Sequence, residues 1–561
     1  MFLYAINYNL GGLCVKKISI FVLLLLAFLL VSCQETKTIE EPFDYSHATV
    51  TITNDGTIYL DELVNFQFNL VVDVKNALED SVLFIIDQQQ NFVTIDENGQ
   101  ITIAANAPRN YWFNVTAVLE ASVNKFHTKD FIVNLTRGVI VGTEQISQVV
   151  LTINGDPMTS RGISWFTSSD ILDSIVYVAD NLAFDNSLRF EGVLNTFEAH
   201  VEAADYANQI APRTFYNHQA IISGLTADTK YYYKVGSDVL NKFSHIGSFT
   251  TSKASGDFTI FLTTDIHVGA NERAASTNRF YNAALTDAFN RYNGIDYALN
   301  TGDIVTQWYS GYQYFESEWA YAMNISPLLR QLTFIPVAGN HDAKITNSGF
   351  FNSLINHYSL PSSPDLINDE QRYGPNYAFE INDLHITILN YHERGHFSNN
   401  QKLWLEDVLS KTTKSWKIVF SHIILPEDVQ EILERHNVVL AYSGHEHVYR
   451  RTSPLLNGIA QTTVYNPVTG FAINPSGTTY VVNTTTGGAG EWRTYNPSPN
   501  EIDGFGINSI LTGLGTAQTR WGMYTVLSIN ANRIKAEIYV RNSTNAQDSF
   551  TLYTTYGFEL S

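Results

Sequence analysis

The chain has 561 residues, a formal net charge of −21 and 44% hydrophobic residues. This length predicts about three or four domains with sizeable cores, and 34 glycines with 15 prolines are too few for collagen or low-complexity disorder. The acidic balance argues against nucleic-acid binding, because nothing would neutralise phosphates in bulk; a phosphate ligand would need a local device such as metal ions. Two cysteines exclude a disulfide framework and a cysteine-based zinc finger.

The N-terminal segment has the pattern of a secretory signal. Lys16 and Lys17 precede an apolar run over 18–31, which is too short to cross a bilayer, since crossing takes about 20 residues. The run ends in Leu-Val-Ser-Cys at Cys33 and resembles the bacterial lipobox, which implies that Cys33 is lipidated; the alternative is a chance cysteine after an ordinary signal. We therefore expect a signal peptide over 1–33 and a polar tether over 34–47. The protein would lie in the bacterial cell envelope and contact the membrane only through the lipid anchor.

Two β regions are expected next. Residues 48–137 consist of short alternating runs broken by turn residues, a pattern typical of a β-sandwich. It resembles cadherin-like or immunoglobulin-like repeats, and we expect a spacer, with calcium sites as the alternative. Residues 138–252 form a second β unit, in which the spacing from Leu225 to Tyr231 looks like a tyrosine corner, where the phenol bonds back to the backbone. We assign no chemistry to either unit.

The pattern changes at Asp257, where short apolar strands begin to alternate with helical stretches. A helix is predicted from Ser276 to Tyr292, and Ser398 with Gln401 forms a capping box that opens another helix. The sequence therefore predicts a multidomain protein, with β-sandwich domains followed by an α/β domain over 257–561 that ends in a β segment.

Five apolar strands of the α/β domain are each followed by side chains of the metal-ligand type. In α/β sheets, ligands gather where the carboxyl ends of strands meet, so we expect one site. Its residues are Asp265 and His267 after the first strand, Asp303 after the second, Asn340 and His341 after the third, His422 after the fourth, and His445 and His447 after the fifth.

This set of side chains suits two metal ions, which need a bridging carboxylate and several neutral nitrogen and oxygen ligands. Gly302, Gly339 and Gly444 are expected to form tight turns that present the next side chain. With two carboxylates against two divalent cations, positive charge would remain to attract a phosphate and to lower the pKa of a bound water.

The ordered motifs DxH, GD, GNHD, H and GHxH resemble the calcineurin-like metallophosphoesterase superfamily over about residues 257–490. Within that superfamily, the GHEHVYRR run at 444–451 and the HQAIISGLTADTKYYYKVG run at 218–236 are similar to purple acid phosphatases, over about residues 139–555. The resemblance implies a fibronectin type III-like N-terminal domain over 138–252. It also implies a four-layer αββα sandwich as the catalytic domain.

The resemblance also implies roles for the site residues. Asp265, His267, Asp303 and His447 would hold one metal; Asp303, Asn340, His422 and His445 would hold the other, with Asp303 as the bridge. His341 would bind the phosphoryl group and help to protonate the leaving oxygen. The chain departs from the purple enzymes at two positions, with His267 in place of a glycine and Thr306 in place of the tyrosine whose phenolate gives the colour. A neutral imidazole favours divalent ions, so we expect manganese, ferrous iron or zinc.

Substrate contacts are less well defined. The purple enzymes carry histidines shortly after the lone ligand histidine, whereas residues 423–434 contain none. His392, Arg394 and His396 follow another strand and are weak candidates for phosphate or leaving-group recognition. We therefore predict a dimetal phosphomonoesterase of acid-phosphatase type that acts on a small phosphate ester by metal-hydroxide attack on phosphorus. The alternatives are a phosphodiesterase of the cyclic-nucleotide or phospholipid type and a non-catalytic cell-surface binding protein.

Overall fold

The computed structural model describes most of the chain from residue 45 onward. The described residues are 45–54, 57–60, 66–78, 80–86, 93–96, 98–104, 111–122, 125–135, 146–167, 170–199, 213–244, 246–268, 272–292, 295–305, 319, 322–323, 327–342, 376–390, 397–487, 493–511, 515–516, 522–541 and 550–561. The predicted signal and tether, with Cys33, lie outside this part. Among the described residues, no helix combines the length and the apolar character that a bilayer crossing requires.

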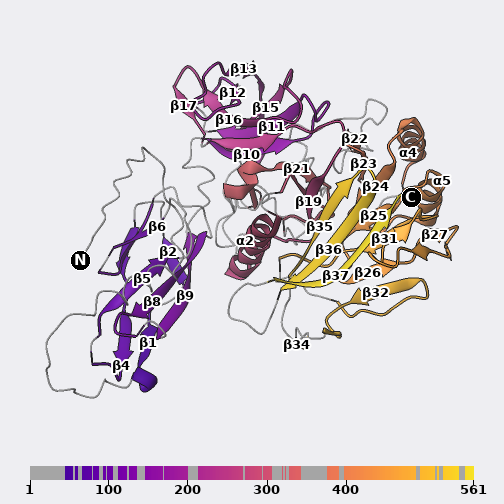
Figure 1. The fold of residues 1–561 in the computed structure, drawn as a ribbon. Coiled ribbons are helices and arrows are strands. Elements are labelled where there is room, and N and C mark those ends of the chain that lie inside the picture. Colours follow the sequence, from indigo (N-terminus) through magenta and orange to yellow (C-terminus); the bar gives the residue numbers. More distant parts are fainter. Residues whose placement is uncertain are drawn as a thin grey trace, which may run out of the picture.

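The first β region has its own hydrophobic core, built from alternating buried residues such as Ile101, Phe113 and Phe131. Its strands form three small sheets (Figure 1). The sheets are β2 (Thr57–Leu60), β9 (Phe126–Leu135), β8 (Tyr111–Leu119) and β5 (Val82–Ile86); β3 (Phe66–Asn69), β7 (Gln100–Ile103) and β6 (Val93–Ile95); and β1 (Thr49–Ile52) with β4 (Val72–Lys75).

The second β region contributes strands to two sheets that enclose a core around the buried Trp165 and Tyr233. The smaller sheet contains β13 (Leu188–Glu191), β12 (Ile175–Ala179), β16 (Lys230–Ser237), β17 (Lys242–Phe243) and β18 (Gly247–Thr250). The backbone N–H of Thr226 donates to the phenol oxygen of Tyr231 at 2.9 Å. The side-chain-to-backbone bond expected of a tyrosine corner is therefore present.

The larger sheet continues from the second β region into the α/β domain without a break. Its order is β14 (Val193–Ala199), β15 (Arg213–Ile222), β11 (Arg161–Thr167), β10 (Ile146–Thr152), β21 (Thr333–Pro336), β20 (Tyr297–Asn300), β19 (Phe258–Thr263), β35 (Met523–Asn530), β36 (Arg533–Arg541), β37 (Phe550–Glu559), β30 (Ala472–Ile473) and β29 (Val464–Tyr465). The junction is the parallel pairing of Thr152 in β10 with Phe334 in β21. The local sequence pattern gave no sign of this continuity.

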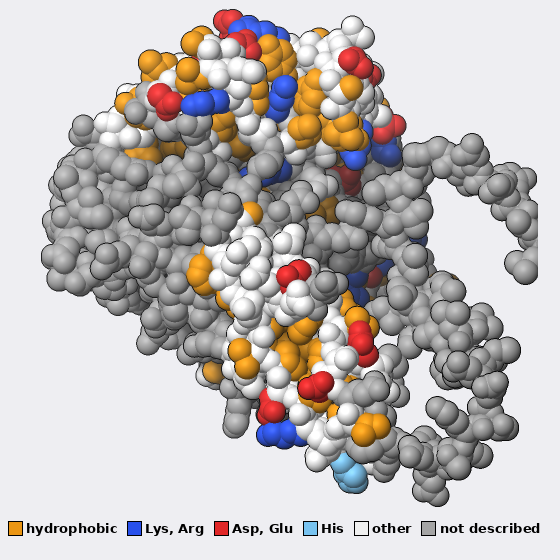
Figure 2. Space-filling model, turned by 90° about the vertical axis from the view of Figure 1, so that its left-hand side faces the viewer, with side chains coloured by type: hydrophobic (Ala, Val, Ile, Leu, Met, Phe, Trp, Pro, Cys, Tyr) orange, Lys and Arg blue, Asp and Glu red, His pale blue; other side chains and the backbone are white. Residues whose placement is uncertain are grey.

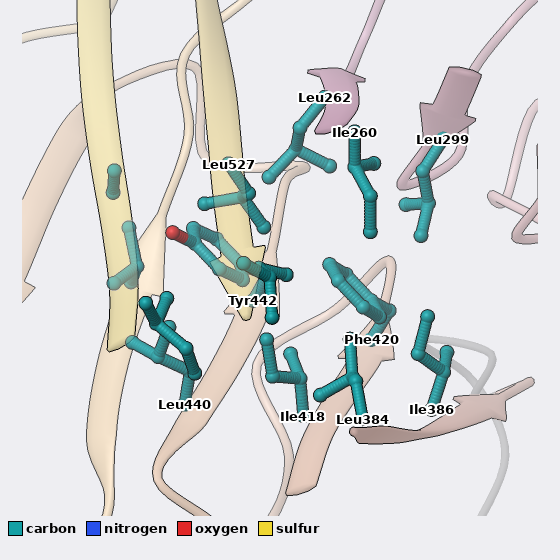
Figure 3. Close-up of a cluster of buried hydrophobic side chains, with 14 of the residues drawn as sticks. Ile260, Leu262, Leu299, Leu384, Ile386, Ile418, Phe420, Leu440, Tyr442 and Leu527 are labelled. Atoms are coloured by element: carbon teal, nitrogen blue, oxygen red, sulfur yellow. The ribbon is translucent and has the colours of Figure 1, made fainter. Parts of the chain in front are cut away.

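A second sheet packs against the α/β part of the larger one. It consists of β22 (Tyr377–Ile381), β23 (Leu384–Leu389), β24 (Trp416–Ser421), β25 (Leu440–Ser443), β31 (Thr479–Val482), β26 (Tyr449–Thr452) and β32 (Glu501–Phe505). Between the sheets lies the main core, in which Leu262 and Leu527 of one sheet face Phe420 and Tyr442 of the other (Figure 3).

Helices cover the outer faces of both sheets. Helix α2 (Glu272–Tyr292) packs on the larger sheet, and helices α4 (Asn399–Lys411) and α5 (Glu427–Arg435) pack on the second sheet (Figure 1). The layers therefore run helix, sheet, sheet, helix. Helix α2 begins earlier than Ser276, because Glu272 to Ala275 contains strong helix formers. The capping box of α4 is confirmed, since Ser398 and Gln401 exchange side-chain-to-backbone bonds of 3.1 and 2.9 Å.

The outer face of the second β region mixes cationic and apolar side chains, as the upper part of Figure 2 shows. The ammonium of Lys234 lies 4.7 Å from the ring centre of Phe243 and 4.9 Å from that of Phe184. The guanidinium of Arg189 pairs with Asp238 at 2.8 Å. These cations are therefore stabilised by rings and carboxylates of the same domain.

A fully buried arginine joins the second β region to the α/β domain. The guanidinium of Arg161 donates to the carbonyls of Ser160 and Thr250 at 2.8 and 3.0 Å and to the hydroxyl of Thr333 at 3.1 Å. The ring of Tyr297 lies 5.9 Å from the guanidinium carbon. Because Tyr297 and Thr333 begin β20 and β21, Arg161 holds the bases of two strands whose other ends carry predicted ligands.

Arg161→Ala should lower the free energy of unfolding by about 3 kcal/mol or more, because carbonyls lose their donor and a cavity opens. Urea unfolding measures this change. The matched control is Arg189→Ala, whose exposed guanidinium forms surface ion pairs and should matter little. Equal effects of the two substitutions would contradict the role of Arg161.

Candidate metal centre

The predicted ligands converge at the carboxyl ends of five strands from both sheets. Strands β19, β20 and β21 are parallel neighbours in the larger sheet, and β24 and β25 are parallel neighbours in the second. The histidines and carboxylates form three overlapping groups whose ligand atoms lie within 4.8 Å of one another. The groups are Asp265, His267 and His447; His267, Asp303 and His341; and Asp303, His422 and His445.

The first group surrounds Asp265, which is fully buried. Its Oδ1 lies 3.3 Å from Nε2 of His447 and 3.8 Å from Nε2 of His267. The two imidazole nitrogens are 3.2 Å apart. Oδ2 of Asp265 accepts bonds from the Thr264 hydroxyl at 2.6 Å and from the His445 N–H at 2.9 Å. These bonds fix the carboxylate so that Oδ1 faces the two histidines.

Asn340 joins the two histidines of the third group. Its side-chain oxygen lies 2.9 Å from Nε2 of His422 and 2.9 Å from Nδ1 of His445. The other ring nitrogen of His422, Nδ1, lies 2.9 Å from the carbonyl oxygen of Thr301. A carbonyl can only accept, so Nδ1 carries the hydrogen and Nε2 is the nitrogen that is available to a metal.

Asp303 belongs to both the second and the third group. Its Oδ2 is 3.1 Å from Nε2 of His422 and 4.0 Å from Nε2 of His267, while Oδ1 accepts the backbone N–H of His341 at 2.8 Å. One carboxylate oxygen is thus held by the backbone and the other is shared between the groups, which is the position required of a bridge. Nε2 of His341 lies 3.7 Å from the same Oδ2, so His341 faces the centre as well.

Most of these ligands have left-handed backbone dihedral angles, which residues other than glycine rarely adopt. The residues with positive φ are Asp265 (46°), His267 (52°), Asp303 (52°), His445 (68°) and His447 (53°). Such strain persists only where the surrounding structure enforces it, and it concentrates at functional sites. Here each strand turns sharply at its end, so that the side chain points toward the centre instead of continuing the sheet.

The glycines at the centre have two different purposes. Gly302 has a φ of +102° and makes the expected tight turn before Asp303. Gly339 and Gly444 are needed because neighbouring groups approach closely. A Cβ at Gly339 would lie 2.2 Å from Oδ1 of Asp303, and one at Gly444 would lie 2.5 Å from Oδ2 of Asp265.

Burial and mutual charge set the protonation of the ligands. Burial opposes the charge of Asp303, but His422 and His341 outweigh it and hold the pKa of the carboxyl well below its usual range. Burial lowers the pKa of His267 to about 3, so its imidazole is neutral, as metal binding requires. Burial acts on His422 in the same direction, yet Asp303 raises the pKa of His422 to about 10. Metal binding must therefore displace a proton from His422, and metal affinity should fall as the pH falls.

One supporting residue was not singled out from the sequence. Asp342 is fully buried and accepts the backbone N–H groups of Ile304, Val305 and Gly339 at 2.9, 3.1 and 3.0 Å. It thereby joins the loop of Asp303 to the loop of Asn340. The signal available in the sequence was its place directly after His341.

Several predicted positions lie outside the described residues, namely His392, Arg394, His396 and Thr306. The structure therefore brings together all seven predicted ligands and His341, and it leaves the weak substrate-contact candidates untested. The set of side chains fits two ions of the divalent first-row type, since it combines carboxylate, amide and imidazole ligands. Asp265, His267 and His447 would hold one ion and Asn340, His422 and His445 the other, with Asp303 between them.

Comparisons with known proteins agree with this geometry. Residues 146–251 match the purple acid phosphatase N-terminal domain, and residues 258–449 match the calcineurin-like phosphoesterase domain. Purple acid phosphatase 23 and probable purple acid phosphatase 20 of Arabidopsis thaliana are each 22% identical to the chain, over 301 and 316 residues. The alignments cover 47% and 52% of this chain and 61% and 66% of the relatives. The chain thus spans less than two thirds of their length.

Purple acid phosphatase PPD1 from yellow lupin seeds has a similar fold, with a TM-score of 0.59 at 14% identity, over 92% of this chain and 96% of that one. The match over residues 258–449 and the convergent ligands therefore agree with the calcineurin-like phosphoesterase domain that the sequence resembles. The resemblance to purple acid phosphatases that the sequence predicted is confirmed by the match over residues 146–251 and by the two relatives.

Gly444→Ala should reduce the metal content of the purified protein, because the new methyl group would displace Asp265 or the Thr264 hydroxyl, which would lie only 2.0 Å from it. Metal analysis after dialysis measures the change. The control is Gly458→Ala, where the added Cβ meets open space at a φ of +69°. That substitution should cost only about 1 kcal/mol in stability and leave the metal content unchanged; equal metal loss in both would contradict the argument.

Proposed function

We propose that this protein hydrolyses phosphomonoesters with the help of two divalent metal ions, with manganese, iron or zinc as the candidates. The observation that carries the proposal is the convergence of seven ligands from five strand ends, one of which is the buried carboxylate of Asp303 shared between two groups. The monoesterase assignment is supported by the order of the domains, which resembles that of relatives named as purple acid phosphatases.

The charge of the site would depend on its ligands and on the metal ions that they hold. When bound, the ions would neutralise the phosphate and lower the pKa of an attacking water. Among the ligands only Asp265 and Asp303 contribute negative charge, so two divalent ions would leave the site positive in sum. A dianionic ester can therefore enter in spite of the overall charge of −21.

His341 is the proposed proton donor to the leaving oxygen. Its backbone N–H is anchored on Asp303 at 2.8 Å, and its ring lies edge-on to that of His267, with 4.8 Å between the ring centres. The side chain is only 8% exposed, so the ring is shielded from solvent and faces the place where a substrate would bind.

Two other functions remain as alternatives. A phosphodiesterase would use the same ligands, and a non-catalytic binding protein would keep the fold without turnover. The complete ligand set favours an enzyme over the binding protein. We also propose that the chain is held in the cell envelope by a lipid at Cys33, with no nucleic acid among its partners; the acidic composition supports the second point.

The test of function is hydrolysis of para-nitrophenyl phosphate beside its bis-ester, by protein that starts at residue 34 and is loaded with manganese, iron or zinc. We expect faster turnover of the monoester. Asp303→Asn serves as the inactive control, since a neutral amide cannot balance two cations, and it should lose both metals on dialysis. Faster turnover of the bis-ester would support the phosphodiesterase, and no turnover with any metal would support the binding protein.

His341→Ala should retain both metals and lower kcat by roughly 10²–10⁴, the usual range for the loss of an acid–base group. His436→Ala is the matched control, because His436 pairs with Glu406 on helix α4, away from the centre. An unchanged rate in His341→Ala would remove this histidine from the mechanism.

The iron-loaded protein should be colourless, because Thr306 stands where the purple enzymes have a tyrosine and His267 lies within 3.8 Å of Asp265. An absorption spectrum in the visible range is the measurement. The double substitution His267→Gly with Thr306→Tyr should create a charge-transfer band. A visible band in the unmodified protein would mean that a phenolate binds the metal, and it would overturn the divalent assignment.

A further inference from the structure

A short segment after β31, residues 483–486, connects the two sheets just below the metal centre. The N–H of Asn483 donates to the carbonyl of Ser443 in the second sheet at 2.9 Å, and that of Thr486 donates to the carbonyl of Thr264 at the end of β19 at 3.0 Å. Ser443 directly precedes the loop of His445, and Thr264 directly precedes Asp265. We call residues 483–486 the roof segment, because they cover the end of the inter-sheet core that lies next to the metal centre.

The roof segment and the neighbouring strand contain five buried polar side-chain atoms that have no hydrogen-bond partner within the described chain. They are Oδ1 and Nδ2 of Asn483 and the hydroxyl oxygens of Thr484, Thr485 and Thr525. All four residues are at most 1% exposed. Native proteins satisfy nearly all buried polar groups, and five unsatisfied atoms together would offset much of the net stability of a domain. A concentration of this kind therefore indicates a polar ligand.

At least two of these residues face the same space from opposite sheets. Thr525 pairs across the strands with Leu262 and lies two residues before Leu527 on the same face of β35. Both leucines point into the inter-sheet core (Figure 3). Asn483 follows Val481 by two residues, and Val481 belongs to the same core. Side chains two residues apart on extended backbone point to the same side. Thr525 and Asn483 therefore both face the end of this core that the roof segment covers. The N–H of Met523 donates to the carbonyl of Thr485 at 3.1 Å, which brings Thr485 to the same place.

We propose that this space is an internal hydration site, in which ordered water binds Asn483, Thr485 and Thr525. Water matches the mixture of groups, since the hydroxyls and Oδ1 accept hydrogen bonds and Nδ2 can only donate. A cation matches it less well, because none of these four residues is a carboxylate that would balance its charge. The site is separate from the ligands themselves and does not depend on the proposed reaction.

The hydration site would stabilise the backbone next to the metal ligands. Its water would hold the roof segment, and the roof segment holds the backbone next to Asp265 and His445, which belong to different ligand groups. The residues around the water are thus positioning residues for both groups. Their loss should affect metal affinity and stability without removing any ligand.

The direct test is a crystal structure of the unmodified protein at a resolution that shows ordered solvent. We expect solvent density within hydrogen-bond distance of Thr525 Oγ1 and of at least two more of the five atoms. A rubidium soak distinguishes water from an alkali cation. An anomalous peak at this place would show that a cation binds there and would overturn the assignment. Absence of density, with the side chains bonded directly to one another, would overturn it too.

Substitutions give a second test that does not require crystals. Thr525→Val removes one hydroxyl at constant shape, and it should lower the melting temperature of the metal-free protein and weaken manganese binding several-fold. Thr525→Ser keeps the hydroxyl and should bind manganese like the unmodified protein, while Thr551→Val, at an exposed strand position, controls for the change in β propensity. If the space is dry, Thr525→Val relieves an unsatisfied hydroxyl and raises the melting temperature, which would overturn the proposal.

Discussion

The centre depends on the contacts that the buried carboxylate of Asp303 makes with the groups around it. One of its oxygens is fixed by a backbone N–H at 2.8 Å, and the other lies within 4.0 Å of nitrogens from His422, His341 and His267. A carboxylate buried at 1% exposure is costly unless cations or hydrogen bonds surround it. The three histidines and the close approach at Gly339 bring polar groups to this anion.

The strain at the strand ends follows from that constraint. Left-handed backbone at Asp265, His267, Asp303, His445 and His447 costs free energy of order 1 kcal/mol or more at each position. The large inter-sheet core and the layers of helices supply the stability that maintains it. This explains why the ligands stand directly at the ends of fully buried strands: only a rigid strand can hold a strained residue against a neighbour.

Most ligands could be predicted from the sequence because each one lies directly after an apolar strand, where local pattern and chemistry coincide. What the sequence could not predict depends on contacts between distant segments. Asp342 bonds Ile304, Gly444 touches Asp265, and β10 joins β21, and none of these contacts has a local signature. At Gly339 and Gly444 the sequence predicted a tight turn. The structure shows instead that glycine is needed there because Asp303 and Asp265 leave no room for a Cβ.

The pair His267 and His447 gives the strongest physical reason for divalent metal. Their Nε2 atoms lie 3.2 Å apart, and burial favours the neutral form of His267. Two neutral imidazoles can present lone pairs to one point only if a proton or a cation lies there. Oδ1 of Asp265 lies 3.3 Å from His447 at the same place. Two lone pairs and one carboxylate that converge on one point would suit a divalent ion.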